Sequence, residues 1–381
     1  MKILNLIKQE RIFAIIFFLS LISSLRTLML PLQGDELTYA MISDNILTGK
    51  YYQVNHPSTV IPVIPFIMSF LKVNSFPHLG FVLHKLLNIG LMFLGFRFAY
   101  LFLKKEKLNQ RVILAILALT ATNSIGIAFF PSLYPESILF FCFWGFMYYF
   151  NSELNTNTFL KTLMLFLLLS ITRYLYLILG ILIIYKFYKH YKQRDRKSIY
   201  KLIVYSFILA LPLLLWFKYI YNIEMQNLSE ISYFNRFKAD NQFLYNIKAG
   251  LGLIQHHEVG KINGIPAFIS LFIPITGFRS YLLSIGLILA FIFGYVKKVH
   301  SEGIKVLLIS IVLIMTGLIF AGTGFNRYWL ILLPGFFLGY YLLGTMLKVK
   351  DRWFIYASQV LCLIYIVNEL RIDYLILNKH L

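Results

Sequence analysis

Two adjacent carboxylates, Asp35 and Glu36, are the residues of this chain whose type and position most clearly indicate chemistry. They follow a hydrophobic stretch over about residues 12–30 and open the segment 34–65. Ionisable side chains where a membrane helix meets water are rare and usually functional. A carboxylate there can act as a general base on a substrate that arrives from the lipid. The pair therefore predicts a reaction at a membrane surface.

Further polar residues stand at the ends of apolar segments far apart in the sequence: His56, Glu136, Arg173, Arg327 and Tyr328. Two carboxylates suit a base and a partner that binds hydroxyl groups. Two guanidinium groups suit a phosphate or diphosphate, which they bind in a bidentate manner. Together they indicate an anionic lipid headgroup that is attacked by a hydroxyl nucleophile.

Each of these residues also has a structural interpretation. Glu136 follows Pro135 at a helix start, where an acid stabilises the positive end of the helix dipole. Arg173 and Arg327 are also able to reach out of the membrane and contact any phospholipid. His56, which precedes a proline, is also suited to capping the next helix. Asp35 is the residue for which the functional interpretation is clearly favoured by its surroundings.

The segment His256-His257-Glu258 has the composition of a metal site. Adjacent histidines point to different faces of a helix or strand, unlike ligands at positions i and i+4. We therefore expect a solvated loop and no metal site there. The two cysteines, Cys142 and Cys362, lie in apolar segments and have neither disulfide nor metal-type spacing.

Composition indicates a membrane protein. Hydrophobic residues make up 59% of the 381 and charged residues only 14%, whereas a soluble domain carries about 25% charged residues. The net charge of +20 comes from basic clusters between the apolar segments, as expected of loops that stay on the cytoplasmic side. This placement argues against nucleic acid as a partner. The clusters are residues 104–111, 186–201, 297–305 and 348–352.

The basic clusters predict an all-α integral membrane protein, one multi-pass domain over residues 1–381 with about eleven transmembrane helices. The N-terminus is expected in the cytoplasm, and segments 32–79 and 222–279 outside it. Segments 58–71 and 265–276 are apolar but short and contain prolines, so we expect interfacial or re-entrant segments. The expected crossings are 12–30, 80–103, 112–130, 135–150, two within 159–189, 200–221, 280–296, 303–321, 328–347 and 353–371.

The segment 37–47 within the first external region has apolar residues at helical spacing. Gly49 is a plausible end for this helix. An amphipathic helix of this kind is expected to lie on the membrane surface. It would carry Asp35 and Glu36 at its start.

These residues resemble the C-type superfamily of glycosyltransferases (GT-C), multi-pass enzymes that use polyprenyl-phosphate-linked sugars. The similarity is greatest to the branch of protein O-mannosyltransferases and lipid A aminoarabinose transferases. It covers most of the chain, with two departures: Ser58 replaces the second proline of a His/Lys-Pro-Pro-like element, and a large soluble C-terminal domain, as found in some relatives, is not expected. The matching elements are Asp35-Glu36, Asn55-His56-Pro57, Glu136 in PSLYPES, Thr172-Arg173-Tyr174, and FNRYWLILLPG from Phe325.

The resemblance implies a GT-C-like bundle with juxtamembrane helices in the first external loop. It also implies inverting transfer of one sugar from a polyprenyl-phosphate carrier to a lipid, glycan or protein acceptor. Asp35 would be the general base, and Glu36 and Glu136 would orient hydroxyl groups. Arg173 and Arg327 would hold the lipid phosphate as it leaves. No cofactor is certain, and a divalent cation stays open because two acids and a histidine can bind one weakly.

The expected location is the cytoplasmic (inner) membrane of a bacterium, with the site on the outer face. Two other classes stay open: a transporter or flippase for polyprenyl lipids, and a non-catalytic subunit of an envelope-assembly complex. A flippase needs a polar route across the bilayer, for which His84, Lys85 and Arg97 are the main candidates. A non-catalytic subunit would not need two acids on an ordered juxtamembrane helix.

Overall fold

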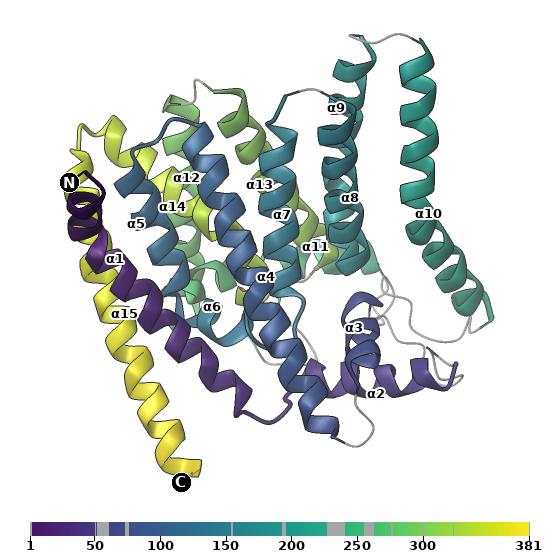
Figure 1. Ribbon diagram of the computed structural model, residues 1–381, viewed down its shortest axis with the longest axis horizontal. Helices are drawn as coiled ribbons and strands as arrows, with labels where there is room; N and C mark the ends of the chain where they lie inside the picture. Colours follow the sequence, from purple (N-terminus) through teal and green to yellow (C-terminus); the bar gives the residue numbers. More distant parts are fainter. Residues whose placement is uncertain are drawn as a thin grey trace.

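The computed structural model describes residues 2–49, 51, 61–72, 76–153, 155–192, 196–226, 241–254, 263–275, 277–298, 301–322 and 324–380. Secondary structure within these ranges is helical, without strands (Figure 1). The prediction of an α-helical membrane protein is confirmed at this level. Within the same ranges six segments are long and apolar enough to cross a bilayer: Glu10–Leu28, His78–Lys105, Ile199–Ile223, Phe278–Val296, Glu302–Ala321 and Asn326–Met346.

The described residues form α-helices and short 3-10 helices. In chain order they are α1 (Lys2–Leu25), η1 (Arg26–Leu28), α2 (Asp35–Leu47), α3 (Val63–Leu71), α4 (Pro77–Lys105), α5 (Gln110–Ala121), α6 (Ser124–Phe129), α7 (Glu136–Phe150), α8 (Thr156–Thr172), η2 (Tyr174–Leu179), α9 (Gly180–Tyr191), α10 (Arg196–Gln226), α11 (Gln242–Gly250), η3 (Ile265–Leu271), α12 (Phe278–Lys298), α13 (Glu302–Ala321), η4 (Asn326–Leu332), α14 (Leu333–Met346) and α15 (Asp351–His380).

Three of the expected crossings are helices shorter than the core of a bilayer. The apolar helices α5, α7 and α8 have 12, 15 and 17 residues, and a 15-residue helix is only about 22 Å long against a bilayer core of about 30 Å. Helix α15 has 30 residues but is not among the six apolar spans. Eleven crossings therefore stay a prediction.

The two short apolar segments form short helices. Helix α3 has nine residues and η3 has seven, so neither is long enough to cross a bilayer. Residues 58–60 and 276 of the predicted segments lie outside the described residues.

The expected single helix over 112–130 is divided into α5 and α6. Asn123 separates them because its side chain accepts a hydrogen bond from Gly126 N, at 3.1 Å, and caps α6. The same side chain donates to Leu271 O at 2.7 Å. An asparagine that satisfies backbone groups in this way favours a helix start over a helix interior.

The described residues of the basic clusters lie at one end of the bundle, here named the basic end (Figure 1). Lys105 Nζ donates to Asn151 O, Lys186 Nζ donates to Phe150 O at 2.7 Å, and Lys189 pairs with Glu302 at 2.7 Å. These contacts join the ends of α4, α7 and α9 to the start of α13. In Figure 1 this end lies at the top, and α2 and α3 lie at the opposite end.

The chain reverses direction at Arg173, where one long apolar run was expected to make two passages. Arg173 has an extended backbone (φ −155°, ψ 123°) between α8 and η2. Lys186 of α9 returns to within 3.4 Å of Thr162 near the start of α8. The predicted break is therefore present, and it places Arg173 at the end opposite the basic end.

Helix α2 runs across that opposite end of the bundle (Figure 1). It begins at Asp35, and Gly49 follows it with φ +77° and donates to Ile46 O at 2.9 Å. A positive φ favours glycine, which agrees with the predicted end of this helix. The expected helix is thus present, with the two acids in its first turn, and its position on a membrane surface stays a prediction.

Candidate functional site

Asp35 is placed by the first turn of α2. Gly34 adopts φ +57° immediately before it, and a Cβ at Gly34 would lie 3.0 Å from the Tyr134 hydroxyl. The turn directs the Asp35 carboxylate to Arg327, with 2.5 Å between Oδ2 and Nη2. The Asp35 side chain is 51% exposed. It therefore combines a fixed position with access from outside.

Glu36 points the other way and is buried. Its Oε2 accepts from Gln33 N at 2.9 Å and its Oε1 accepts from Leu133 N at 2.8 Å. Both carboxylate oxygens therefore accept hydrogen bonds from backbone N–H groups. One bond closes the turn before α2, and the other connects α2 to the loop before α7. This geometry gives Glu36 a positioning contact, whereas its adjacent carboxylate Asp35 faces outward.

Glu136 opens α7 and is fully buried. Its Oε1 lies 2.9 Å from Arg173 Nη2 and 3.8 Å from Arg327 Nε. The acid favours a helix start because of the dipole, but a buried carboxylate also needs charged partners to offset its lost hydration. The two arginines supply them.

Arg327 lies among aromatic rings near the start of η4. Its Cζ is 4.4 Å from the centre of the Tyr134 ring and 5.7 Å from that of Phe129. The Tyr328 ring covers the other arginine, with Arg173 Cζ 3.8 Å from its centre. Planar guanidinium groups pack well on aromatic faces. The rings thereby fix both cations without consuming their hydrogen-bond donors.

The four charged side chains form one chain of contacts from the surface inward: Asp35, Arg327, Glu136 and Arg173. Two acids and two arginines balance in charge. The Asp35 end is accessible, while the Arg173 and Arg327 side chains are 14% and 11% exposed. Sequence reasoning predicted these four residues at one membrane face, and the structure brings them into contact. Chemically the arrangement offers one accessible base next to a cation that can exchange its carboxylate partner for an anionic substrate.

Two tyrosines beside the network, Tyr134 and Tyr39, were not identified from the sequence, because tyrosine is abundant throughout the chain. Tyr134 donates to Gln33 O at 3.1 Å, and burial raises the pKa of this phenol, so it stays a donor. Tyr39 of α2 is buried against the Tyr134 ring, 6.2 Å between centres. The only sequence signal for Tyr134 was its position next to Pro135-Glu136.

Two sequence-based expectations concern His56 and the segment 256–258, which was expected to be a solvated loop. His56 and the segment 256–258 lie outside the described residues. Across the part of the chain that the structure describes, no group of three or more His, Cys, Asp or Glu side chains is suited to hold a metal ion.

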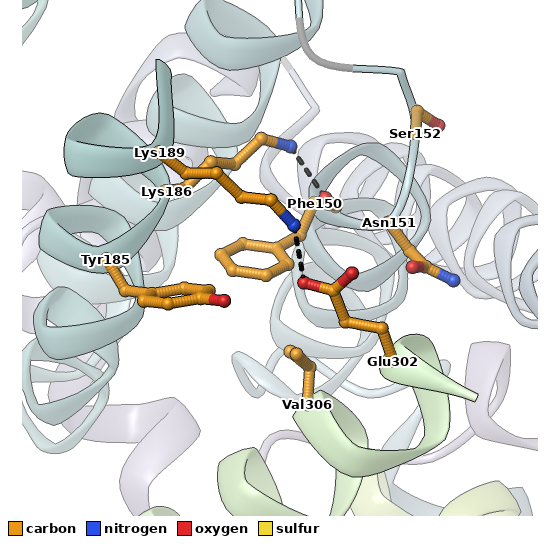
Figure 2. Close-up of a pocket in the computed structure, with 8 residues that line it drawn as sticks. All are labelled: Phe150, Asn151, Ser152, Tyr185, Lys186, Lys189, Glu302 and Val306. Carbon is orange, nitrogen blue, oxygen red and sulfur yellow. Dashed lines mark hydrogen bonds and ion pairs between the residues drawn. The ribbon is translucent and has the colours of Figure 1, made fainter. Parts of the chain in front are cut away.

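A cavity of about 110 Å³ lies at the basic end, away from the network (Figure 2). Lys186 and Lys189 point toward it from α9, and Glu302 faces them from α13. The Lys186 ammonium is already bonded to Tyr149 O and Phe150 O, both at 2.7 Å, so it caps the last turn of α7. Its contacts explain the cavity wall as helix capping.

Comparison of the chain with protein-family models, with curated proteins and with solved structures finds no match. What the site does must therefore be argued from its own residues.

Proposed function

We propose that this protein is an inverting membrane glycosyltransferase that moves a sugar from a polyprenyl-phosphate carrier to an acceptor. The observation that carries the proposal is the contact between the accessible Asp35 carboxylate and Arg327, at the end of the bundle opposite the basic clusters. A base beside a replaceable cation suits attack on a carbon that bears a phosphate leaving group.

In the proposed reaction the Asp35 carboxylate takes the proton of an acceptor hydroxyl. The acceptor oxygen forms a bond to the anomeric carbon of the sugar as the bond from that carbon to the phosphate oxygen breaks. The bond electrons leave with the polyprenyl phosphate, and the configuration at the anomeric carbon inverts. The proton remains on Asp35 until it is lost to water.

The phosphate would be bound by Arg327. Its guanidinium contacts Asp35 at 2.5 Å, and a phosphate competes with a carboxylate for the same donors. Donor binding would thus release Asp35 at the moment when a base is needed. Glu36 would keep α2 in register through Leu133, and Glu136 and Arg173 would support Arg327 from within.

The partners under this proposal are a polyprenyl-phosphate-linked sugar, an acceptor that is a lipid, glycan or protein, and the surrounding membrane lipids. The location would be the cytoplasmic membrane of a bacterium, with the basic end in the cytoplasm and the network on the outer face.

One observation favours the transporter alternative. His84 of α4 is fully buried, and neither ring nitrogen has a hydrogen-bond partner among the described residues. Its neighbour Lys85 does not extend this into a route, because it donates to Thr27 O and Leu30 O at 2.6 and 2.9 Å. Lys85 thus fastens α4 to η1 and the residues after it, and the glycosyltransferase remains the better supported function.

The proposal is tested with purified full-length protein in lipid nanodiscs and radiolabelled polyprenyl-phosphate sugars. We expect sugar to be released from the carrier and transferred to an acceptor. Movement of intact carrier across a liposome membrane without cleavage would instead support a flippase. If neither transfer nor carrier movement is detected with a broad panel of donors, the result would support a non-catalytic subunit.

A second measurement concerns Arg327. We expect Arg327→Ala to raise the KM for the lipid donor roughly 10- to 100-fold, which corresponds to losing a hydrogen bond to a charged group. Initial rates over a range of donor concentrations measure this effect. Arg279→Ala is the matched control, because Arg279 is exposed at the start of α12 and shares only a general attraction to anionic lipid. Equal donor dependence in both variants would remove Arg327 from the phosphate site.

A further inference from the structure

Three buried polar atoms next to the network lack a hydrogen-bond partner among the described residues: Glu136 Oε2, Arg173 Nη1 and Tyr176 Oη. They come from the start of α7, the break after α8, and η2. Buried polar groups in folded proteins are nearly always bonded, so each exception calls for an explanation. Three exceptions on neighbouring side chains indicate a shared missing partner.

The three side chains are neighbours by several measures. Arg173 Nη2 and Glu136 Oε1 form the 2.9 Å ion pair, so the free atoms Nη1 and Oε2 belong to the same two groups. Tyr176 follows one 3-10 turn later, with its backbone N bonded to Arg173 O at 3.1 Å. Its phenol interacts electrostatically with both charged side chains. The side chain of Tyr176 is fully buried, so bulk water does not serve its hydroxyl.

The missing partner must both donate and accept. Glu136 Oε2 accepts a hydrogen, Arg173 Nη1 donates one, and a phenol does either. A phosphate would meet the negative charge of Glu136 at close range, and an apolar group would leave all three atoms unsatisfied. A hydroxyl group satisfies both demands with one oxygen.

The position of the three atoms indicates which substrate would bring that hydroxyl. Tyr328 covers Arg173 with its ring, and Arg327 lies 3.8 Å from Glu136. Glu136 and Arg173 thus lie on the buried side of the residue that would hold the donor phosphate, whereas Asp35, which would receive the acceptor, lies at the exposed end. The sugar attached to that phosphate is the group that would reach behind Arg327.

We propose that Glu136 Oε2, Arg173 Nη1 and Tyr176 Oη form a subsite for one hydroxyl group of the donor sugar, and that Tyr176 determines specificity for this hydroxyl. This inference rests on the proposed glycosyltransferase function. Because the Tyr328 ring covers Arg173 in the present structure, the sugar would enter as the donor phosphate takes the place of Asp35 on Arg327.

The test compares the wild-type protein with Tyr176→Phe, which removes one oxygen. The measurement is kcat/KM for the full donor and for donors that lack one sugar hydroxyl each. In the wild type, kcat/KM is expected to be roughly 10- to 100-fold lower for one deoxy donor than for the full donor, because the missing hydroxyl would contact charged groups. In Tyr176→Phe this penalty is expected to shrink several-fold, while the penalties for the other deoxy donors stay as they are.

Tyr295→Phe is the matched control. Tyr295 is also fully buried, but its hydroxyl donates to Gly335 O at 2.7 Å in another part of the bundle. It should keep the wild-type penalties. If Tyr176→Phe also keeps every penalty, then the three atoms bind only water and the subsite is refuted, while the transferase function stands. If the wild type transfers no sugar from any donor, the proposed function fails and the sugar subsite fails with it.

Thermal unfolding without substrate gives a second, independent result. Removal of an unsatisfied buried hydroxyl does not destabilise a protein, whereas removal of a bonded one does. Tyr176→Phe should therefore unfold at or above the wild-type temperature, and Tyr295→Phe below it. A clear decrease for Tyr176→Phe would show that the hydroxyl is already hydrogen-bonded without substrate, and would overturn the unsatisfied hydroxyl on which the subsite rests.

Discussion

Replacing Asp35 by asparagine is expected to lower sugar transfer by roughly 10²- to 10⁴-fold, the range for loss of a general base. The amide keeps the size of the side chain and a contact to Arg327 but cannot take the acceptor's proton. Because Asp35 is half exposed, the exchange should not disturb the fold. Transfer is measured with purified protein and saturating labelled donor, and folding is checked by gel filtration and thermal unfolding.

Asp44→Asn is the control for this variant. Asp44 lies on the same helix α2, is exposed, and pairs with Lys72. The same chemical change there should leave transfer within about twofold of wild type. Near-normal turnover by Asp35→Asn would end its assignment as the base, and equal losses in both variants would point to a general effect of the charge of α2.

The sequence predicted the candidate site better than the details of its surroundings. Basic loops and apolar segments predicted Asp35, Glu136, Arg173 and Arg327 at one membrane face, and the structure brings the four side chains into one chain of contacts. Topology alone made this possible, since helix ends that share a side of the membrane are near one another in a small bundle. The pairing of Arg173 with Glu136 could not be predicted, because it depends on how α7 and α8 pack.

Other features depend on tertiary contacts that no pattern in the sequence indicates. Glu36 and Asp35 are adjacent and chemically alike, yet Glu36 turns inward because Leu133 N and Gln33 N need an acceptor. Likewise Tyr176 is one of 26 tyrosines, and it differs in having a buried hydroxyl without a hydrogen-bond partner among the described residues. Hydropathy also could not predict where α5 ends, because Asn123 divides the apolar run through its own hydrogen bonds.

The second large effect concerns stability. We expect Glu136→Ala to lower the free energy of unfolding by about 3–5 kcal/mol, the range for breaking a buried ion pair by removing one partner. The side chain of Glu136 is fully buried, and its loss leaves Arg173 without its only carboxylate contact recorded in the described residues. Arg327 is less affected because it retains Asp35. Denaturant titration of the protein in mixed micelles, followed by fluorescence, measures the change.

Glu302→Ala provides the matched control for this effect. Glu302 also lies in the first turn of a helix and pairs with a lysine at 2.7 Å, but its side chain is 58% exposed. Solvent screens such pairs, so its loss should change stability by less than about 1 kcal/mol. The double variant Glu136→Gln/Arg173→Gln should regain part of the loss, because no uncompensated charge then remains at that position. If Glu136→Ala is no more destabilising than Glu302→Ala, then the inner ion pair does not hold α7 against the break after α8, and Arg327 must be positioned by its aromatic neighbours alone.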